Sequence, residues 1–91
     1  MNKERRKELG RAITLLNGAQ EKLEEAKEIV ESVKDEEEEA YDNMPEGLQE
    51  SERGEAMQEN IDELDTVIDE LESIYDSVEE QIYAINEITE K

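Results

Sequence analysis

Apolar and small side chains recur along this chain in alternating steps of three and four residues, and this spacing decides which fold the chain can form. In the first half, with one lapse at Glu37, the repeat consists of Leu9, Ala12, Leu16, Ala19, Leu23, Ala26, Val30, Val33, Ala40 and Met44. Ile13, Ile29 and Tyr41 widen this stripe. A sustained heptad spacing is typical of a helix that packs along its length against another helix. We therefore predict a long helix over about residues 3–43, with the small residues at 12, 19, 26, 33 and 40 in its contact seam.

The second half carries a stronger version of the same repeat. Its members are Met57, Ile61, Leu64, Ile68, Leu71, Tyr75, Val78, Ile82 and Ile85. Val67, Ile74 and Ile88 broaden this stripe beyond what one partner helix can cover, to the width expected in a helix bundle. We predict a second helix over about residues 51–90, and dimerisation of the chain into a four-helix bundle.

Residues 44–50 contain the turn signals of the chain. Pro45 disfavours a helical conformation at the residue before it, and Ser51 can cap the helix that follows. The connection is short, so the two helices should run antiparallel. Asn17-Gly18 could mark another turn, but the heptad register continues through it. The predicted fold class is all-α, a single antiparallel two-helix hairpin resembling a coiled coil.

Composition excludes several classes of function. The chain has 91 residues, among them 29 Asp or Glu and 10 Lys or Arg, with neither His nor Cys. Disulfide scaffolds, Cys/His zinc sites and catalysis by His or Cys are therefore excluded. Acidic pairs such as Glu21 with Glu24 and Glu59 with Asp62 superficially resemble Mg²⁺-binding motifs, but in so acidic a chain such pairs are expected by chance. We expect a protein that is not an enzyme and that has no cofactor and no metal site.

The stretch DEEEEAYDNMPEGLQESERGEAMQENIDELDTVIDELE, residues 35–72, resembles a type of small uncharacterised protein of bacteriophages and mobile elements of Gram-positive bacteria. The specific part of the resemblance is DNMPEGLQESERGE, residues 42–55. This resemblance implies a setting, phage against host, and carries no catalytic residue with it.

The N-terminus is basic, but the apolar stretch behind it covers only residues 12–16. A signal peptide needs roughly 7–15 apolar residues and a membrane span about 20. We therefore expect a soluble protein of the cytoplasm, which would be the host cytoplasm if a phage encodes it.

Negative charge is concentrated in one half of the expected hairpin. The open half, residues 1–19 and 75–91, has a net charge of −1, whereas residues 20–74 have −18 of the total −19. This loop half is ~36 Å long, so it has one net negative charge per ~2 Å, against one per ~1.7 Å along duplex DNA. Residues 35–39 are all acidic although they lie at a helix C-terminus, where the helix dipole favours cations.

These observations predict a non-enzymatic, DNA-mimicking inhibitor of a basic, nucleic-acid-binding host protein involved in defence. The chain would bind neither nucleic acid nor membranes itself, and it would form a homodimer. The expected contact residues are Glu36, Glu38, Glu39, Asp42, Glu52, Glu55, Glu59, Asp62, Glu63, Asp69 and Glu70. The alternative is an acidic coiled-coil adaptor or assembly protein that binds its partner through the apolar stripe. Mimicry requires competition with DNA and steep salt sensitivity, whereas apolar binding is largely indifferent to salt.

Overall fold

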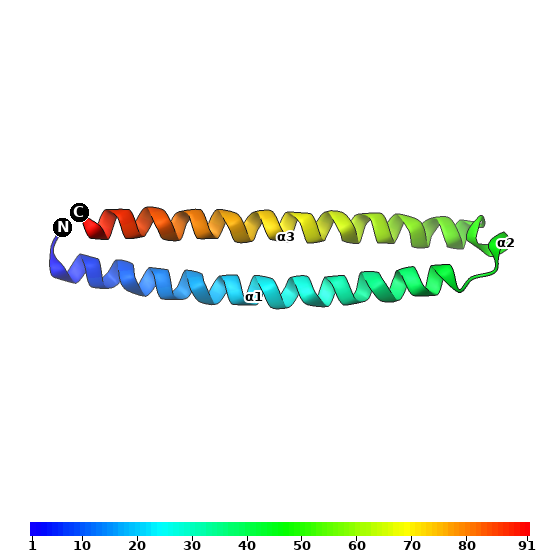
Figure 1. Cartoon of the computed structure of the whole chain (residues 1–91), viewed down its shortest axis with the longest axis horizontal. Coiled ribbons are helices and arrows are strands. Elements are labelled where there is room, and N and C mark those ends of the chain that lie inside the picture. The colour runs from blue at the N-terminus through cyan, green and yellow to red at the C-terminus, as the bar shows by residue number, and fades with distance from the viewer.

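The computed structural model describes residues 1–91 and confirms the all-α hairpin. Helix α1 spans Lys3–Asp42, the short helix α2 spans Glu46–Gln49, and helix α3 spans Glu52–Glu90. Helices α1 and α3 lie side by side and antiparallel, so both termini are at one end and α2 is at the other (Figure 1). The molecule measures 69 × 15 × 13 Å and is a rod rather than a globule. Neither long helix is apolar enough over a sufficient length to cross a membrane.

Side-chain caps fix the start of each long helix. The Asn2 side chain accepts a hydrogen bond from the backbone N–H of Arg5 at 2.9 Å. As predicted, Ser51 is the N-cap of α3, and its Oγ accepts from the N–H of Gly54 at 3.4 Å. Such caps satisfy N–H groups that have no partner within the helix. Asn17 and Gly18 lie inside α1, which continues through them without a break.

The connection contains a helical turn that the sequence pattern did not predict. Helix α1 ends at Asp42, and Pro45 precedes the four residues of α2. The side chain of Gln49 donates a hydrogen bond to the backbone carbonyl of Tyr41 at 2.9 Å and thereby ties α2 back to the end of α1. A periodic signal needs more than one turn, which is why so short a helix leaves no trace in the apolar spacing.

Gly54, in the first turn of α3, is buried against this connection. A Cβ atom there would overlap the backbone carbonyl of Gln49 and would lie 2.6 Å from the carbonyl oxygen of Leu48. We expect Gly54→Ala to destabilise the hairpin by about 1–3 kcal/mol, since backbone atoms must move to admit the methyl group. Gly18→Ala is the matched control, because a Cβ there meets nothing within 4 Å. It should stabilise the hairpin by about 0.5–1 kcal/mol. Chemical denaturation followed by circular dichroism measures both, and a stabilising Gly54→Ala would contradict this account of the turn.

On α3 the apolar seam is the one that the heptad spacing predicts. Ile61, Ile68 and Ile82 are buried, and the intervening repeat residues from Met57 to Ile85 are half-buried. Val67, Ile74 and Ile88 remain 43%, 47% and 44% exposed, so a single partner helix does not cover them, as expected.

On α1 half of the predicted seam is wrong. Of the predicted row, Ala12 and Ala26 are half-buried, but Ala19, Val33 and Ala40 are exposed. The second row of contact positions is instead Ile13, Gln20, Lys27, Lys34 and Tyr41. The whole set is displaced by one residue from the predicted row of small residues. The physical reason is area, because Ile13, Tyr41 and the aliphatic stems of the two lysines bury more apolar surface than a row of alanines would.

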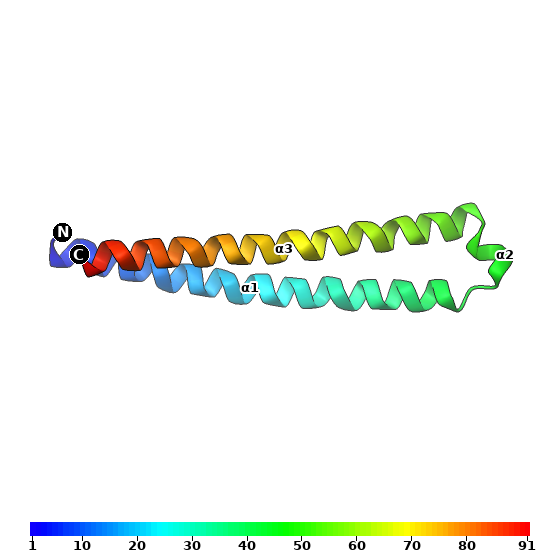
Figure 2. The same cartoon turned by 45° about the horizontal axis from the view of Figure 1, so that its top comes forward.

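Few residues of the hairpin are fully buried. Only five of 91 reach that state, and one of them, Gln20, is polar. The side-chain nitrogen of Gln20 donates to the backbone carbonyl of Tyr75 at 3.3 Å, so its polarity is satisfied across the seam. In Figure 2 α3 overlies α1 near the open end and separates from it in view toward the loop, so the helices cross at a shallow angle. Such a crossing lets two long stripes stay in contact.

Candidate functional site

Two lysines occupy seam positions of α1 and hold carboxylates of both helices. Lys27 Nζ lies 2.8 Å from Glu72 and 4.0 Å from Glu31. Lys34 Nζ lies 2.9 Å from Asp65 and 3.5 Å from Glu38. Both lysine side chains are only 22% exposed, because their stems pack along the seam.

The ion pairs change the acid–base behaviour of both lysines. The hydrogen bond to Glu72 raises the pKa of Lys27 above its usual 10.5, and this effect exceeds the lowering by partial burial. The hydrogen bond to Asp65 raises the pKa of Lys34 in the same way. Both groups are thus held in the charged form, and each ties α1 to α3.

We number the heptad with Gln20, Lys27 and Lys34 at position a of α1, and with Ile61, Ile68 and Ile82 at position a of α3. This numbering divides the hairpin into two long sides. Positions b and e lie on one side of the seam, and positions c and g lie on the other. The grooves beside the seam follow this division. One groove is lined by Glu38, Tyr41, Asp42, Gln58 and Ile61, all at a, b or e. Another is lined by Glu37, Asn60, Glu63, Leu64 and Val67, all at c, d or g.

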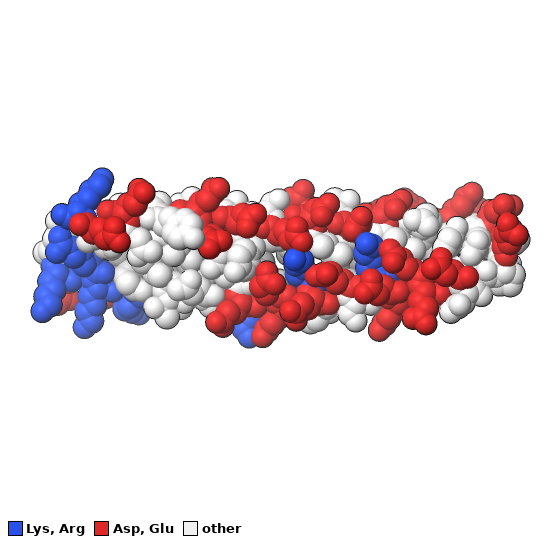
Figure 3. Space-filling model, viewed as in Figure 1, with Lys and Arg blue, Asp and Glu red and all other residues white.

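The side with positions b and e is densely acidic from the loop to about the middle of the rod, and we call it the acidic face. Each long helix contributes seven carboxylates to this face. They are Glu21, Glu24, Glu28, Glu31, Asp35, Glu38 and Asp42 on α1, and Glu55, Asp62, Asp65, Asp69, Glu72, Asp76 and Glu79 on α3. On the side drawn in Figure 3, acidic side chains cover both helices toward the loop, while basic side chains gather at the opposite end. The four carboxylates that contact Lys27 or Lys34 lie in the inner rows, next to the seam.

The charge spacing of the acidic face is close to that of nucleic acid. Its fourteen carboxylates and the two seam lysines give a net −12 over ~35 Å of rod. This is one negative charge per ~3 Å, between the ~1.7 Å of a duplex and the ~3.4 Å of one of its strands. Except between Glu55 and Asp62, neighbouring carboxylates on one helix are three or four residues apart. This spacing places their Cβ atoms about 5–6 Å from one another.

The structure does not bring all eleven expected contact residues together. Ten are exposed, and Glu38 is half-buried beside Lys34. Five of the eleven lie on the acidic face, namely Glu38, Asp42, Glu55, Asp62 and Asp69. The other six lie at the outermost position f or on the opposite side, namely Glu36, Glu39, Glu52, Glu59, Glu63 and Glu70.

The sequence-based selection omitted nine carboxylates of this face. They are Glu21, Glu24, Glu28, Glu31, Asp35, Asp65, Glu72, Asp76 and Glu79. A signal for them existed, because acids recur every seven residues at 21, 28, 35 and 42 and again at 55, 62, 69 and 76. Finding it required the heptad count to be applied to the charged residues as well as to the apolar ones.

The opposite side, with positions c and g, has a different chemistry, and we call it the apolar face. Every large aliphatic residue that is exposed on the two long helices lies there, namely Leu15, Ile29, Val33, Val67, Ile74 and Ile88. The rod therefore has an acidic long side and an apolar long side.

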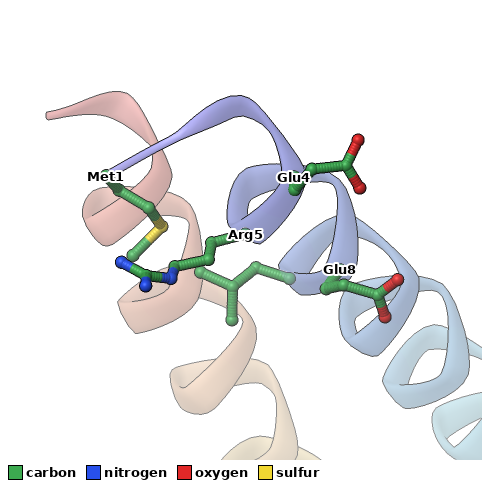
Figure 4. Close-up of a pocket in the computed structure, with 5 residues that line it drawn as sticks. Met1, Glu4, Arg5 and Glu8 are labelled. Carbon is green, nitrogen blue, oxygen red and sulfur yellow. The ribbon is translucent and has the colours of Figure 1, made fainter.

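The hollows along the rod are open grooves. The groove at the open end is lined by Met1, Glu4, Arg5, Glu8 and Leu9. In Figure 4 Arg5 and Met1 extend toward the end of α3, whereas the carboxylates of Glu4 and Glu8 point away from it. No group of three or more Asp or Glu side chains has a geometry that could hold a metal ion. What the arrangement offers chemically is a broad array of hydrogen-bond acceptors.

Comparison of the chain with protein-family models, with curated proteins and with solved structures gives no match.

The seam lysines predict a loss of stability at high pH. Because the pKa of each is higher in the folded chain than the usual 10.5, their contribution is complete below about pH 10.5 and is lost as pH rises through the folded values. A hydrogen bond to Glu79 also raises the pKa of Tyr83, and its contribution has the same sign. The urea midpoint of the natural sequence should therefore be lower at about pH 12 than at about pH 9.

The double variant Lys27→Met with Lys34→Met is the control for this pH dependence. It should show a smaller fall between the two pH values, because only the other titrating groups then respond. An equal fall in both proteins would mean that the seam ion pairs do not stabilise the hairpin.

Proposed function

We propose that this chain is a non-enzymatic inhibitor that presents DNA-like negative charge to a basic, nucleic-acid-binding protein. The observation that supports this proposal is the acidic face, with its fourteen carboxylates and two partly buried lysines along ~35 Å of a rigid rod. The resemblance of residues 35–72 to small phage proteins favours a phage-encoded protein that acts in the host cytoplasm on a defence component.

The rod would bind as a fixed template. Carboxylates pair well with Lys and Arg side chains that otherwise hold phosphates, because both anions accept charge-assisted hydrogen bonds, and from Arg in a bidentate geometry. Lys27 and Lys34 hold the inner carboxylates in place, so part of the side-chain ordering is complete before the partner arrives. The same negative charge would repel nucleic acid itself, which makes a basic protein the expected partner.

The test is capture followed by displacement. The protein is immobilised and exposed to an extract of a Gram-positive host, and bound proteins are then eluted with duplex DNA. We expect DNA to release a basic, nucleic-acid-binding protein, since both ligands would occupy one surface. If every captured protein stays bound in excess DNA, the mimicry proposal is wrong.

The second candidate function is that of an acidic coiled-coil adaptor or assembly protein, which would include the homodimer in a four-helix bundle. The apolar face supports it, because its six aliphatic residues are between 43% and 72% exposed in the isolated hairpin. Salt separates the two candidates. Binding through carboxylates weakens as salt rises, whereas apolar binding does not.

A further inference from the structure

The exposed aliphatic side chains of the two long helices are confined to one side of the rod. Leu15 is 72% exposed and Ile29 is 65% exposed, and both are at heptad position c of α1. The remaining four are at position g, on both helices. Scattered exposed aliphatics are ordinary, but a one-sided row along the whole rod marks a surface that another chain covers.

The two helices contribute to this row at matching heights. The ion pairs of Lys34 with Asp65 and of Lys27 with Glu72 set the register. In this register Val33 is level with Val67, and seven residues away Ala26 is level with Ile74. A shallow groove beside the seam on this side is lined by Leu16, Ile74 and Val78, together with four polar side chains. The aliphatic side chains of this face thus come from both helices and alternate with carboxylates at position c, such as Glu63 and Glu70. The groove offers a place for an inserted side chain.

The surface area of the hairpin indicates how much of it an additional chain should cover. The hairpin exposes 6865 Å², whereas a compact monomer of 10.5 kDa exposes about 5400 Å². The excess is larger than the ~800 Å² that each partner buries in an interface of standard size. The rod has only five buried residues, so it has enough exposed surface for a large interface and would bury additional apolar side chains by forming one.

We infer that a second copy of this chain docks on the apolar face, with the two rods antiparallel. This inference extends the assembly function named above and is independent of the DNA-mimic proposal. A second copy presents the same row of aliphatic side chains. An interface with two-fold symmetry requires this, because both subunits contribute the same surface to it. An anionic membrane is excluded as the occupant, because it would repel a chain with a net charge of −19.

Charge fixes the orientation of the two rods. A parallel arrangement would set the loop halves, each with a net charge of −18, beside one another. An antiparallel arrangement sets each loop half beside the partner's open half, whose net charge is only −1 because residues 3–11 hold five basic and two acidic side chains. Arg5 is at position g, on the apolar side of this end. Both acidic faces then point outward and remain accessible on opposite sides of the assembly.

The first test is the mass in solution at micromolar concentration. We expect twice the 10.5 kDa chain mass by light scattering. Leu15→Gln with Ile29→Gln should raise the dissociation constant about a hundredfold, because four aliphatic side chains per dimer lose burial, each worth about threefold. Tyr83→Gln is the matched control, because Tyr83 is 61% exposed but lies on the acidic side. It should leave the dimer intact, and circular dichroism should find unchanged helix content in both variants.

The second test addresses orientation with spin labels. The chain has no Cys, so Gly47→Cys and Lys22→Cys each introduce one labelling site, at the loop and near the middle of the rod. In the antiparallel dimer two labels at position 47 should be separated by a distance close to the 69 Å length of the rod, and two labels at 22 should be close together. The inference would be overturned if the protein with the natural sequence is a monomer. It would also be overturned if Leu15→Gln with Ile29→Gln leaves the dimer intact. Short distances at position 47 would overturn the orientation. None of these results bears on competition with DNA, so the DNA-mimic proposal is tested separately.

Discussion

Neutralising the outer row of the acidic face should lower the affinity for a DNA-binding partner by roughly a hundredfold, at about 0.7 kcal/mol for each of four lost charge contacts. The four changes are Glu28→Gln, Asp35→Asn, Asp62→Asn and Asp69→Asn, all at heptad position b. These side chains are exposed and form no ion pair within the hairpin, so folding does not depend on their charge. Their loss removes negative charge from the partner-binding side alone. Titration of the partner with the variant, at constant ionic strength, measures the effect.

A matched control tests whether the affinity depends on the acidic face or only on the total negative charge of the loop half. Glu36→Gln, Glu39→Gln, Glu63→Gln and Glu70→Gln remove the same charge from the same half, but these residues lie at positions c and f. We expect this variant to retain most of its affinity. Equal losses in the two variants would mean that the total charge of the loop half, and not the acidic face, carries the interaction.

Truncation of one buried seam residue should have the largest effect on stability. Ile68 is 9% exposed at the centre of α3, and Ile68→Ala should cost about 2–4 kcal/mol through lost burial and the cavity left behind. A chain of this length is stable by only about 5–14 kcal/mol, so this single change removes a large part of the total. Urea denaturation followed by circular dichroism at 222 nm measures the difference.

The control for Ile68→Ala is Tyr83→Ala on the same helix. Tyr83 is 61% exposed, and its hydroxyl donates a hydrogen bond to half-buried Glu79 at 3.1 Å. Because little apolar surface is lost, we expect a change within about 0.5 kcal/mol. A similar cost for both substitutions would contradict the assignment of Ile68 to the core.

Sequence spacing predicted α3 better than α1 for a physical reason. On α3 the seam residues are large and apolar, and most of their neighbours at positions b and e are acidic, so one register is favoured. On α1 two adjacent rows were possible, one of alanines and Val33 and the other containing Ile13, Lys27 and Lys34. Hydropathy favours the first row. The second prevails because lysine stems pack in a seam while their ammonium groups reach Glu72 and Asp65, contacts that only the paired helices create.

The same register decides which carboxylates share a face. The concentration of charge in the loop half followed from counting residues, but its division into an acidic face and an apolar face required the positions of Lys27 and Lys34 in the seam. With the seam displaced by one residue, the side of each acid is displaced as well. Glu36 and Glu38 illustrate the consequence, because they are two residues apart and lie on opposite sides of the rod.

The most direct measurement of the central claim is a competition experiment. The partner that DNA releases from the immobilised protein is bound to a fluorescent duplex, and this complex is titrated with the protein at about 50 mM and about 200 mM salt. DNA mimicry predicts that the protein displaces the duplex, and that its own affinity falls at least a hundredfold between the two salt concentrations, as expected for many charge contacts. A complex in which the duplex stays bound beside the protein, or an affinity that does not change with salt, would contradict it.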